Sequence, residues 1–282
     1  MLKQRIITAL VLLALFLPAV FASASWPFVA LTLVLMAAGT WEWGRLNGQS
    51  AARAMPAALV WLFVCGAGWY AGWHMQPHHG LWLWAGGAWV FLGVWMIARG
   101  VQGWTSWPVS LRWAVGWILL ALSWMAMVQA QSRGVNFLLS VLVLVWAADV
   151  LAYFGGRAWG GRWIRVKLAP AISPGKSWEG VFAGMIGVIG VGLFWVWLDQ
   201  RLAITTPSLF SVLASHGLWV FLPAVLFLCA MSVVGDLVES LVKRSAGVKD
   251  SSGLLPGHGG VLDRVDALLP TLPLAMMLVS WL

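Results

Sequence analysis

Long apolar segments, each ended by a short polar stretch, repeat along almost the whole 282-residue chain. A helix that crosses a lipid bilayer needs roughly 17–25 apolar residues, and nine segments reach or approach that length. They cover residues 6–22, 26–44, 54–73, 81–98, 113–131, 135–155, 181–198, 217–236 and 262–281. The start of the last one is the least regular, because it carries Asp263 and Asp266. The pattern therefore predicts about nine transmembrane helices.

Composition excludes a soluble domain. The chain is 61% apolar and 9% charged, whereas soluble domains carry about 25% charged residues. Lipid offers no partner to unpaired backbone groups, and the segments are too long and unbroken for a membrane β-barrel. The predicted fold is therefore an all-α polytopic membrane protein, with residues 1–282 forming a single integral membrane domain.

The position of the basic residues predicts the orientation. With nine spans and a cytoplasmic N-terminus, all 17 Lys and Arg residues except Arg133 and Arg201 fall on the cytoplasmic side. The C-terminus is then external. A net charge of +8 spread over membrane loops suits anionic lipid and nucleotide, and it makes nucleic-acid binding a poor interpretation. We expect a multi-pass protein of a bacterial-type inner (plasma) membrane.

Two features of the apolar segments have simple interpretations. Residues 1–25 resemble a signal peptide, with Lys3 and Arg5 before an apolar core, but an uncleaved first helix is the favoured interpretation. Cys65 and Cys229 both lie inside apolar segments, so they predict neither a disulfide framework nor a zinc site, and we expect small core residues.

The chain changes character at about residue 135. Residues 1–134 have short loops and almost no charge inside the segments, which predicts scaffold helices. Residues 135–282 hold two longer polar loops, 156–180 and 237–261, that the topology places on one face. We expect the catalytic helices and cytoplasmic loops in this second part.

Four polar residues share one face where the eighth segment ends. Asp236, Glu239, Ser240 and Lys243 follow at i, i+3, i+4 and i+7. Charged residues at membrane depth are functional candidates by default. Pairing of Glu239 with Lys243 is the simpler structural alternative.

A second acidic pair begins the ninth segment. Asp263 and Asp266 are three residues apart and share a face, so they can converge with Asp236 on one cation. Mg²⁺ prefers a few carboxylates together with substrate phosphates and water, and these three residues are the predicted metal ligands. An ion pair between Asp263 and Arg264 is the structural alternative.

A glycine-rich turn precedes this pair. Residues 256–260 read Pro-Gly-His-Gly-Gly, and glycines allow a positive φ and close approach of the backbone to a ligand. Backbone N–H groups at a following helix start favour phosphate, which makes Gly259 and Gly260 candidate binding residues. His258 is a candidate for phosphate contact or proton transfer, or alternatively a histidine that caps the loop. Lys249 and Asp250 lie just upstream.

The earlier polar loop has its own motif at residues 172–180. Gly175-Lys176-Ser177 looks like part of a Walker A loop, but the first glycine and the preceding strand are missing. Lys176 and Ser177 are instead candidate phosphate contacts near a helix start. The structural alternative is helix capping, since Ser177 and Glu179 suit a first helical turn.

Other polar residues stand alone in apolar surroundings. Asp149 lies within the sixth segment and is a functional candidate. For Glu42 we expect a structural pair with Arg45 at i+3. His74, His78 and His79 share a short external loop, where an adventitious cluster is favoured over a transition-metal site.

The residues from Ser240 to Asp266 resemble the signature of the phosphatidate cytidylyltransferase (CDP-diacylglycerol synthase) family. They match Ser-x-apolar-Lys-Arg, four residues, Lys-Asp, and then Pro-x-His-Gly-Gly-x-x-Asp-Arg-x-Asp, without a break in spacing. Residues 173–180 resemble the family's Ser-Pro-x-Lys-(Ser/Thr)-x-Glu-Gly element, and Asp149 its Asp before Ala-Tyr-x-x-Gly. Val150 and Leu151 depart from the small residue or Thr that usually follows that Asp.

The resemblance implies transfer of a cytidylyl group from CTP to phosphatidate, with Mg²⁺ as the cofactor. The implied catalytic residues are Asp236, Lys249, Asp250, His258, Asp263 and Arg264. The implied substrate-binding residues are Asp149, Ser173, Lys176, Ser177, Ser240, Lys243, Arg244, Gly259 and Gly260. Partners would be CTP, phosphatidate and membrane lipid, and the sequence leaves a homodimer open.

Two other functions stay open at this point. An ion-coupled transporter could use the aspartates as an ion path, although its charges should lie near mid-span and its halves should show repeat symmetry. A related CTP-dependent enzyme could act on another lipid acceptor, such as a polyprenol or an ether lipid.

Overall fold

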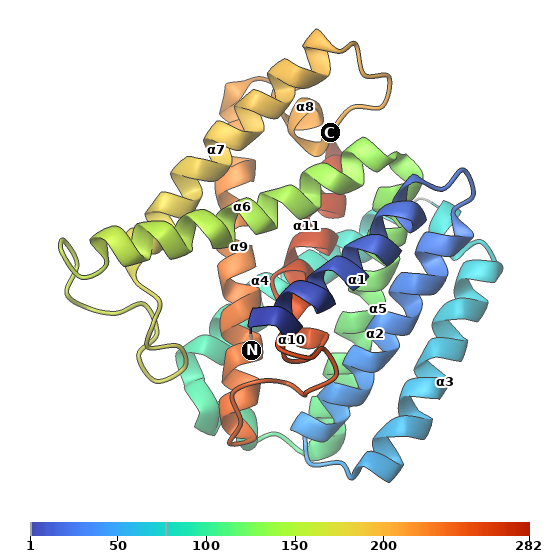
Figure 1. The fold of residues 1–282 in the computed structure, drawn as a ribbon, viewed down its shortest axis with the longest axis vertical. Helices are drawn as coiled ribbons and strands as arrows, with labels where there is room; N and C mark the ends of the chain where they lie inside the picture. The colour runs from blue at the N-terminus through green and yellow to red at the C-terminus, as the bar shows by residue number, and fades with distance from the viewer. Residues whose placement is uncertain (1, 77) are drawn as a thin grey trace.

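The computed structural model describes residues 2–76 and 78–282, and its elements are helices (Figure 1). They are α1 (Leu2–Phe21), α2 (Trp26–Leu46), α3 (Ala51–Tyr70), the 3-10 helix η1 (Trp73–Met75), α4 (His79–Thr105), α5 (Val109–Arg133), α6 (Val135–Trp159), α7 (Trp178–Arg201), α8 (Leu209–Ser215), α9 (Leu218–Ser245), α10 (Leu262–Val265) and α11 (Leu268–Trp281). Within the described ranges, β-structure is limited to two isolated bridges, both in loops. The all-α prediction is confirmed.

Seven of the described helices are long and apolar enough to cross a membrane: α1, α3, α4, α5, α6, α7 and α9. This confirms a multi-pass membrane protein. The predicted count of nine also included α2 and the segment 262–281. Helix α2 carries Glu42 and Arg45 near its end, and α11 has only 14 residues, so neither is among the seven.

The segment 262–281 is not the single helix that its apolar pattern predicts. It is divided into α10 and α11 at Asp266 and Ala267. Pro270 has no N–H to donate to the carbonyl of Asp266, so regular helical hydrogen bonding cannot continue through this point. Helix α9 approaches the break closely, because a Cβ on Gly235 would lie 2.5 Å from the Asp266 carbonyl oxygen. The break places α10, with Asp263 and Arg264, beside α9.

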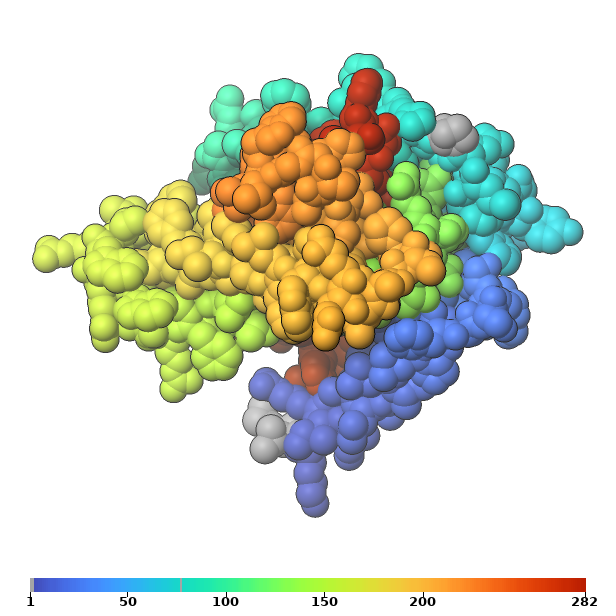
Figure 2. Space-filling model, turned by 90° about the horizontal axis from the view of Figure 1, so that it is seen from above, coloured from blue at the N-terminus to red at the C-terminus, as the bar shows by residue number. Residues whose placement is uncertain are grey.

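Helices α9 and α11 lie in the middle of the bundle, with α4 and α5 on one side and α6 and α7 on the other (Figure 1). The α6–α7 pair extends to one side of the molecule, away from the N-terminal helices (Figure 2). Small residues allow α7 to lie directly on α6, since a Cβ on Gly180 or Gly184 would come within 2.9 Å of an α6 carbonyl oxygen. This contact fixes the wall of α6 that carries Asp149.

One hydrophobic core joins the scaffold helices to the C-terminal part. It includes Trp43 and Trp82 from the first part and Leu228 and Leu274 from the second. Cys229 is buried in this core and Cys65 packs against it, both as free thiols.

Candidate active site

A cavity of about 740 Å³ opens between α6, the loop before α7, α9 and α10. Its size is in the range of small-molecule sites, roughly 300–1,000 Å³. The candidate residues that line it are Asp149, Ser173, Lys176, Ser177, Asp236, Asp263, Arg264 and Asp266. The structure therefore brings both sequence motifs and the isolated Asp149 to one place.

The loop of residues 160–177 is held at the start of α7. The Ser177 hydroxyl accepts a hydrogen bond from the Gly180 N–H at 3.2 Å and caps the helix, which confirms the capping interpretation. Glu179 Oε1 accepts three backbone N–H groups of the loop, from Gly161, Trp163 and Ile164, at 2.9–3.1 Å. Glu179 thus shapes the loop that presents Lys176, a role that sequence spacing alone did not indicate.

Lys176 joins the two motifs. Its Nζ lies 2.6 Å from Asp236 Oδ2, and the Ser240 hydroxyl donates to Asp236 Oδ1 at 3.2 Å. The side chains of Lys176 and Asp236 are 25% and 29% exposed, so both remain accessible from the cavity. A basic group and a carboxylate therefore stand side by side where a charged ligand can reach them.

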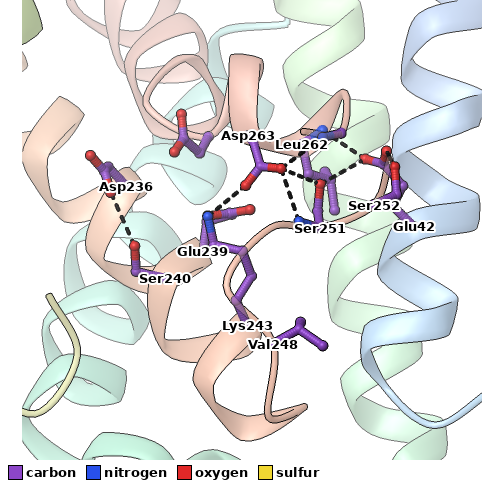
Figure 3. A network of polar contacts seen from close by, with 12 residues as sticks. Glu42, Asp236, Glu239, Ser240, Lys243, Val248, Ser251, Ser252, Leu262 and Asp263 are labelled. Atoms are coloured by element: carbon purple, nitrogen blue, oxygen red, sulfur yellow. Dashed lines mark hydrogen bonds and ion pairs between the residues drawn. The ribbon is translucent and has the colours of Figure 1, made fainter. Parts of the chain in front are cut away.

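Lys243 lies deeper, between two acids (Figure 3). Its Nζ contacts Glu239 Oε2 and lies 2.6 Å from Asp263 Oδ1. The alternative pairing of Glu239 with Lys243 is confirmed, whereas Asp263 pairs with Lys243 rather than with Arg264. Arg264 lines the cavity.

Asp263 accepts hydrogen bonds on both oxygens. Oδ1 takes the Lys243 ammonium, and Oδ2 takes the Gly260 N–H at 2.8 Å and the Ser251 N–H and hydroxyl at 2.9 and 2.8 Å. Asp263 lies in α10, outside the seven spanning helices. Burial opposes its ionisation, but these donors outweigh it and hold the pKa of Asp263 below its usual value. The carboxylate is therefore ionised and fixed in orientation.

The glycine-rich turn needs its glycines for steric reasons. Gly259 has φ +82°, and a Cβ there would lie 2.6 Å from Asp263 Oδ2. A Cβ on Gly260 would lie 2.0 Å from the Ser251 hydroxyl oxygen. Both glycines thus let the loop close around the carboxylate of Asp263.

The remaining candidates are not part of the cavity lining. Arg244 donates to the backbone carbonyls of Ile172 and Val248 at 3.3 and 3.1 Å, and so links the two loops. Lys249 and Asp250 are exposed on the loop surface, and His258 is half-buried in the glycine-rich turn. Their assigned roles, like those of Ser240, Lys243, Gly259 and Gly260 toward substrate, stay predictions.

The donor set suits a hard cation, although it is not preassembled. Asp149, Asp236, Asp263 and Asp266 all face the cavity, and carboxylate oxygens are the ligands that Mg²⁺ prefers. Among the residues that the structure describes, no three His, Cys, Asp or Glu side chains are arranged closely enough to hold a metal ion. The histidines near η1 contact separate partners, with His78 and His79 each bonded to a backbone carbonyl.

Residues from the scaffold part also reach the site. Glu42 is fully buried and contacts the loop of residues 251–262, so its expected pairing with Arg45 is wrong. Arg45 instead lies over the Trp41 ring, 5.0 Å from its centroid. From α1, Arg5 and the Thr8 hydroxyl donate to backbone carbonyls in the glycine-rich turn at 3.0 and 2.9 Å.

The fold and the cavity define a multi-pass membrane protein with a site of mixed acidic and basic side chains at one face. The chain belongs to the cytidylyltransferase family, whose model matches residues 3–282. It is 37% identical to the phosphatidate cytidylyltransferase of Pseudomonas aeruginosa over 280 residues, which cover 97% of this chain and 95% of that one. It is 34% identical to the enzymes of the same name from Haemophilus influenzae, over 97% and 96% of the two chains, and Brucella abortus, over 95% and 89%.

Proposed function

We propose that this protein transfers a cytidylyl group from CTP to phosphatidate and releases CDP-diacylglycerol and pyrophosphate. The observation that carries the proposal is the convergence of both motifs on one cavity, where Lys176, Asp236, Asp263 and Arg264 lie together. Family membership and the names of the relatives support the same reaction.

The chemistry needs no covalent intermediate on the protein. A phosphatidate phosphate oxygen attacks the α-phosphorus of CTP in line, and the bond from that phosphorus to the bridging oxygen of pyrophosphate breaks. The second pKa of a phosphate monoester is about 6, so the attacking oxygen is largely anionic at neutral pH. A dedicated general base is therefore not required. Lys176 and Arg264, at the cavity wall, would neutralise phosphate charge.

Mg²⁺ is the proposed cofactor, with Asp236, Asp263 and Asp266 as its ligands. When bound, the ion would supply Lewis-acid stabilisation of phosphate charge. The carboxylates on the cavity wall support this assignment. Asp236→Asn should weaken Mg²⁺ binding, read out by isothermal titration with the purified protein and the metal alone, and should also abolish turnover. Binding and turnover equal to wild type would remove Asp236 from the ligand set.

We further propose about nine membrane crossings, with α2 and α11 added to the seven long apolar helices, and a cytoplasmic N-terminus and site. Arg5, near the N-terminus, contacts the glycine-rich turn, which puts the N-terminus and the site on one face. The basic residues predict that this face is cytoplasmic.

Single cysteines test this topology. Ser173→Cys and Leu254→Cys, in a background without Cys65 and Cys229, should resist membrane-impermeant thiol reagents in intact cells and react after permeabilisation. Labelling of either position from outside would contradict the orientation.

Purified protein, CTP labelled at the α-phosphate, Mg²⁺ and phosphatidate provide the decisive assay. Label should move into the lipid phase. In a parallel reaction with CTP labelled at the γ-phosphate, label in lipid without any from the α-phosphate would indicate a lipid kinase. No label in lipid from either position would favour a transporter. Replacing phosphatidate with a polyprenyl phosphate separates the remaining alternative, a CTP-dependent enzyme with another acceptor.

A further inference from the structure

Glu42 is a carboxylate buried in the protein interior, on α2, and it is 0% exposed. Four polar groups of residues 251–262 surround it. Oε1 accepts the Ser252 hydroxyl at 2.5 Å and the Val261 N–H at 2.9 Å. Oε2 accepts the Leu262 N–H at 2.8 Å and lies 3.2 Å from the Ser251 hydroxyl oxygen. All four partners lie in residues 251–262, more than 200 positions further along the chain.

No ion pair to Glu42 forms among the residues that the structure describes. A buried charge without hydrogen-bonding partners is strongly unfavourable, so the carboxylate requires the donors of this loop. The loop depends on Glu42 in turn, because the backbone N–H groups of Val261 and Leu262 donate to its carboxylate. If the loop moved away, the carboxylate of Glu42 would stay buried without hydrogen-bond donors.

The contacts continue from Glu42 to the cavity. The Ser251 hydroxyl lies between Glu42 Oε2 at 3.2 Å and Asp263 Oδ2 at 2.8 Å (Figure 3). A hydroxyl has one proton, so it donates to one of the two carboxylates and lies against the other. Leu262, whose N–H is bound by Glu42, directly precedes Asp263 and Arg264, which line the cavity.

We propose that Glu42 is a positioning residue for the reaction, which fixes residues 251–262 so that Asp263 and Arg264 face the substrate cavity. It does not line the cavity and acts through Ser251 and Leu262. The expected change in kcat rests on the proposed function. The expected change in the mobility of residues 251–262 does not.

Glu42→Gln keeps the size of the side chain and replaces an acceptor oxygen with an amide NH₂ that faces other donors. Loss of a hydrogen bond that orients a residue of the active site typically lowers activity by about 10–100-fold. We expect kcat to fall by that amount, with the KM for phosphatidate unchanged. Amide hydrogen exchange should accelerate in residues 251–262. Ser252→Ala, which removes one hydrogen-bond donor to Glu42, should lower kcat by a smaller factor in the same direction.

Asp199 provides a matched control at the C-terminal end of α7, opposite the loop side of the bundle. It is 7% exposed and accepts hydrogen bonds from Asn136, the Ser208 N–H and the Ser211 hydroxyl at 2.6–3.2 Å. Asp199→Asn should lower thermal stability in detergent yet leave kcat unchanged at temperatures where the protein stays folded. Exchange in residues 251–262 should stay at the wild-type rate.

Wild-type kcat in folded Glu42→Gln would overturn the proposal. So would equal losses of kcat in Glu42→Gln and Asp199→Asn at matched stability, because Glu42 would then be only structural. If Glu42→Gln does not fold, Ser252→Ala decides, and unchanged kcat and exchange in that variant would refute the positioning role. If the wild type forms no CDP-lipid, the proposed function fails. Unchanged amide exchange in residues 251–262 of Glu42→Gln would separately refute the restraint of this loop by Glu42.

Discussion

Lys243 offers a direct test of the charge arrangement at the end of α9. Its ammonium is the one cation that contacts both Glu239 and Asp263 in the described structure. The three side chains are nearly dry, with exposed fractions of 11% for Lys243, 3% for Glu239 and 6% for Asp263. Lys243→Met keeps most of the aliphatic stem and removes the ammonium group, so it isolates the contribution of the ion pairs and their hydrogen bonds.

The expected loss of stability follows from this burial. Removing one partner of a buried ion pair typically costs about 3–5 kcal/mol, because the other charge stays buried without compensation. Asp263 retains three other donors, from Ser251 and Gly260, whereas Glu239 has no other partner among the described residues. Most of the cost should therefore come from Glu239.

A double-mutant cycle measures this contribution. Unfolding in detergent micelles is compared for wild type, Lys243→Met, Glu239→Gln and the double variant. The double variant should recover most of the loss seen in Lys243→Met, since neutral replacements of a buried pair are often tolerated. If Lys243→Met unfolds like wild type, or if Glu239→Gln brings no recovery, the assignment of the loss to an uncompensated Glu239 is refuted.

Three further predictions concern the cavity and the glycine-rich turn. Arg264→Lys should lower turnover markedly although charge is kept, because only Arg has a planar fork for two phosphate oxygens, whereas Arg201→Lys should match wild type in the same assay. Gly260→Ala should lower turnover at least as much, since its methyl would lie 2.0 Å from the Ser251 hydroxyl oxygen, and normal activity would show that the turn can relax. Arg5→Ala should speed proteolysis or amide exchange in the glycine-rich turn, and an unchanged rate would show that α1 does not restrain it.

The cavity could be predicted from sequence because charged residues are rare in this chain. Asp149, Asp236 and Asp263 stand out in apolar surroundings, and the structure places all three at one cavity. Lipid makes isolated charges unfavourable, so in a membrane protein they point to function or pairing more strongly than in water. The helices were predictable for the same reason, because long apolar segments have few other structures open to them.

Contacts with the backbone could not be predicted in this way. Glu42 has Arg45 at i+3, which suggests an ion pair, but its partners are N–H groups and hydroxyls about 210 residues away. Glu179 likewise binds backbone N–H groups that any sequence would supply. Backbone donors leave no trace in residue types, so a buried carboxylate that organises a loop resembles one that forms a local pair. The break before α11 could have been predicted from Pro270, but hydrophobic periodicity alone takes no account of proline.

The contacts of Glu42 also constrain the order in which the protein can be assembled. During synthesis, α2 is made long before residues 251–262, so its carboxylate has no donors until nearly the whole chain has been translated. Until then, water at the membrane surface is the only adequate environment for that charge. The end of α2 that carries Glu42 should therefore stay at the interface and reach its final depth late. A nascent chain that stops before residue 251 lacks both the donors to Glu42 and the glycine-rich turn. This end of α2 would then stay hydrated, and the cavity would be incomplete.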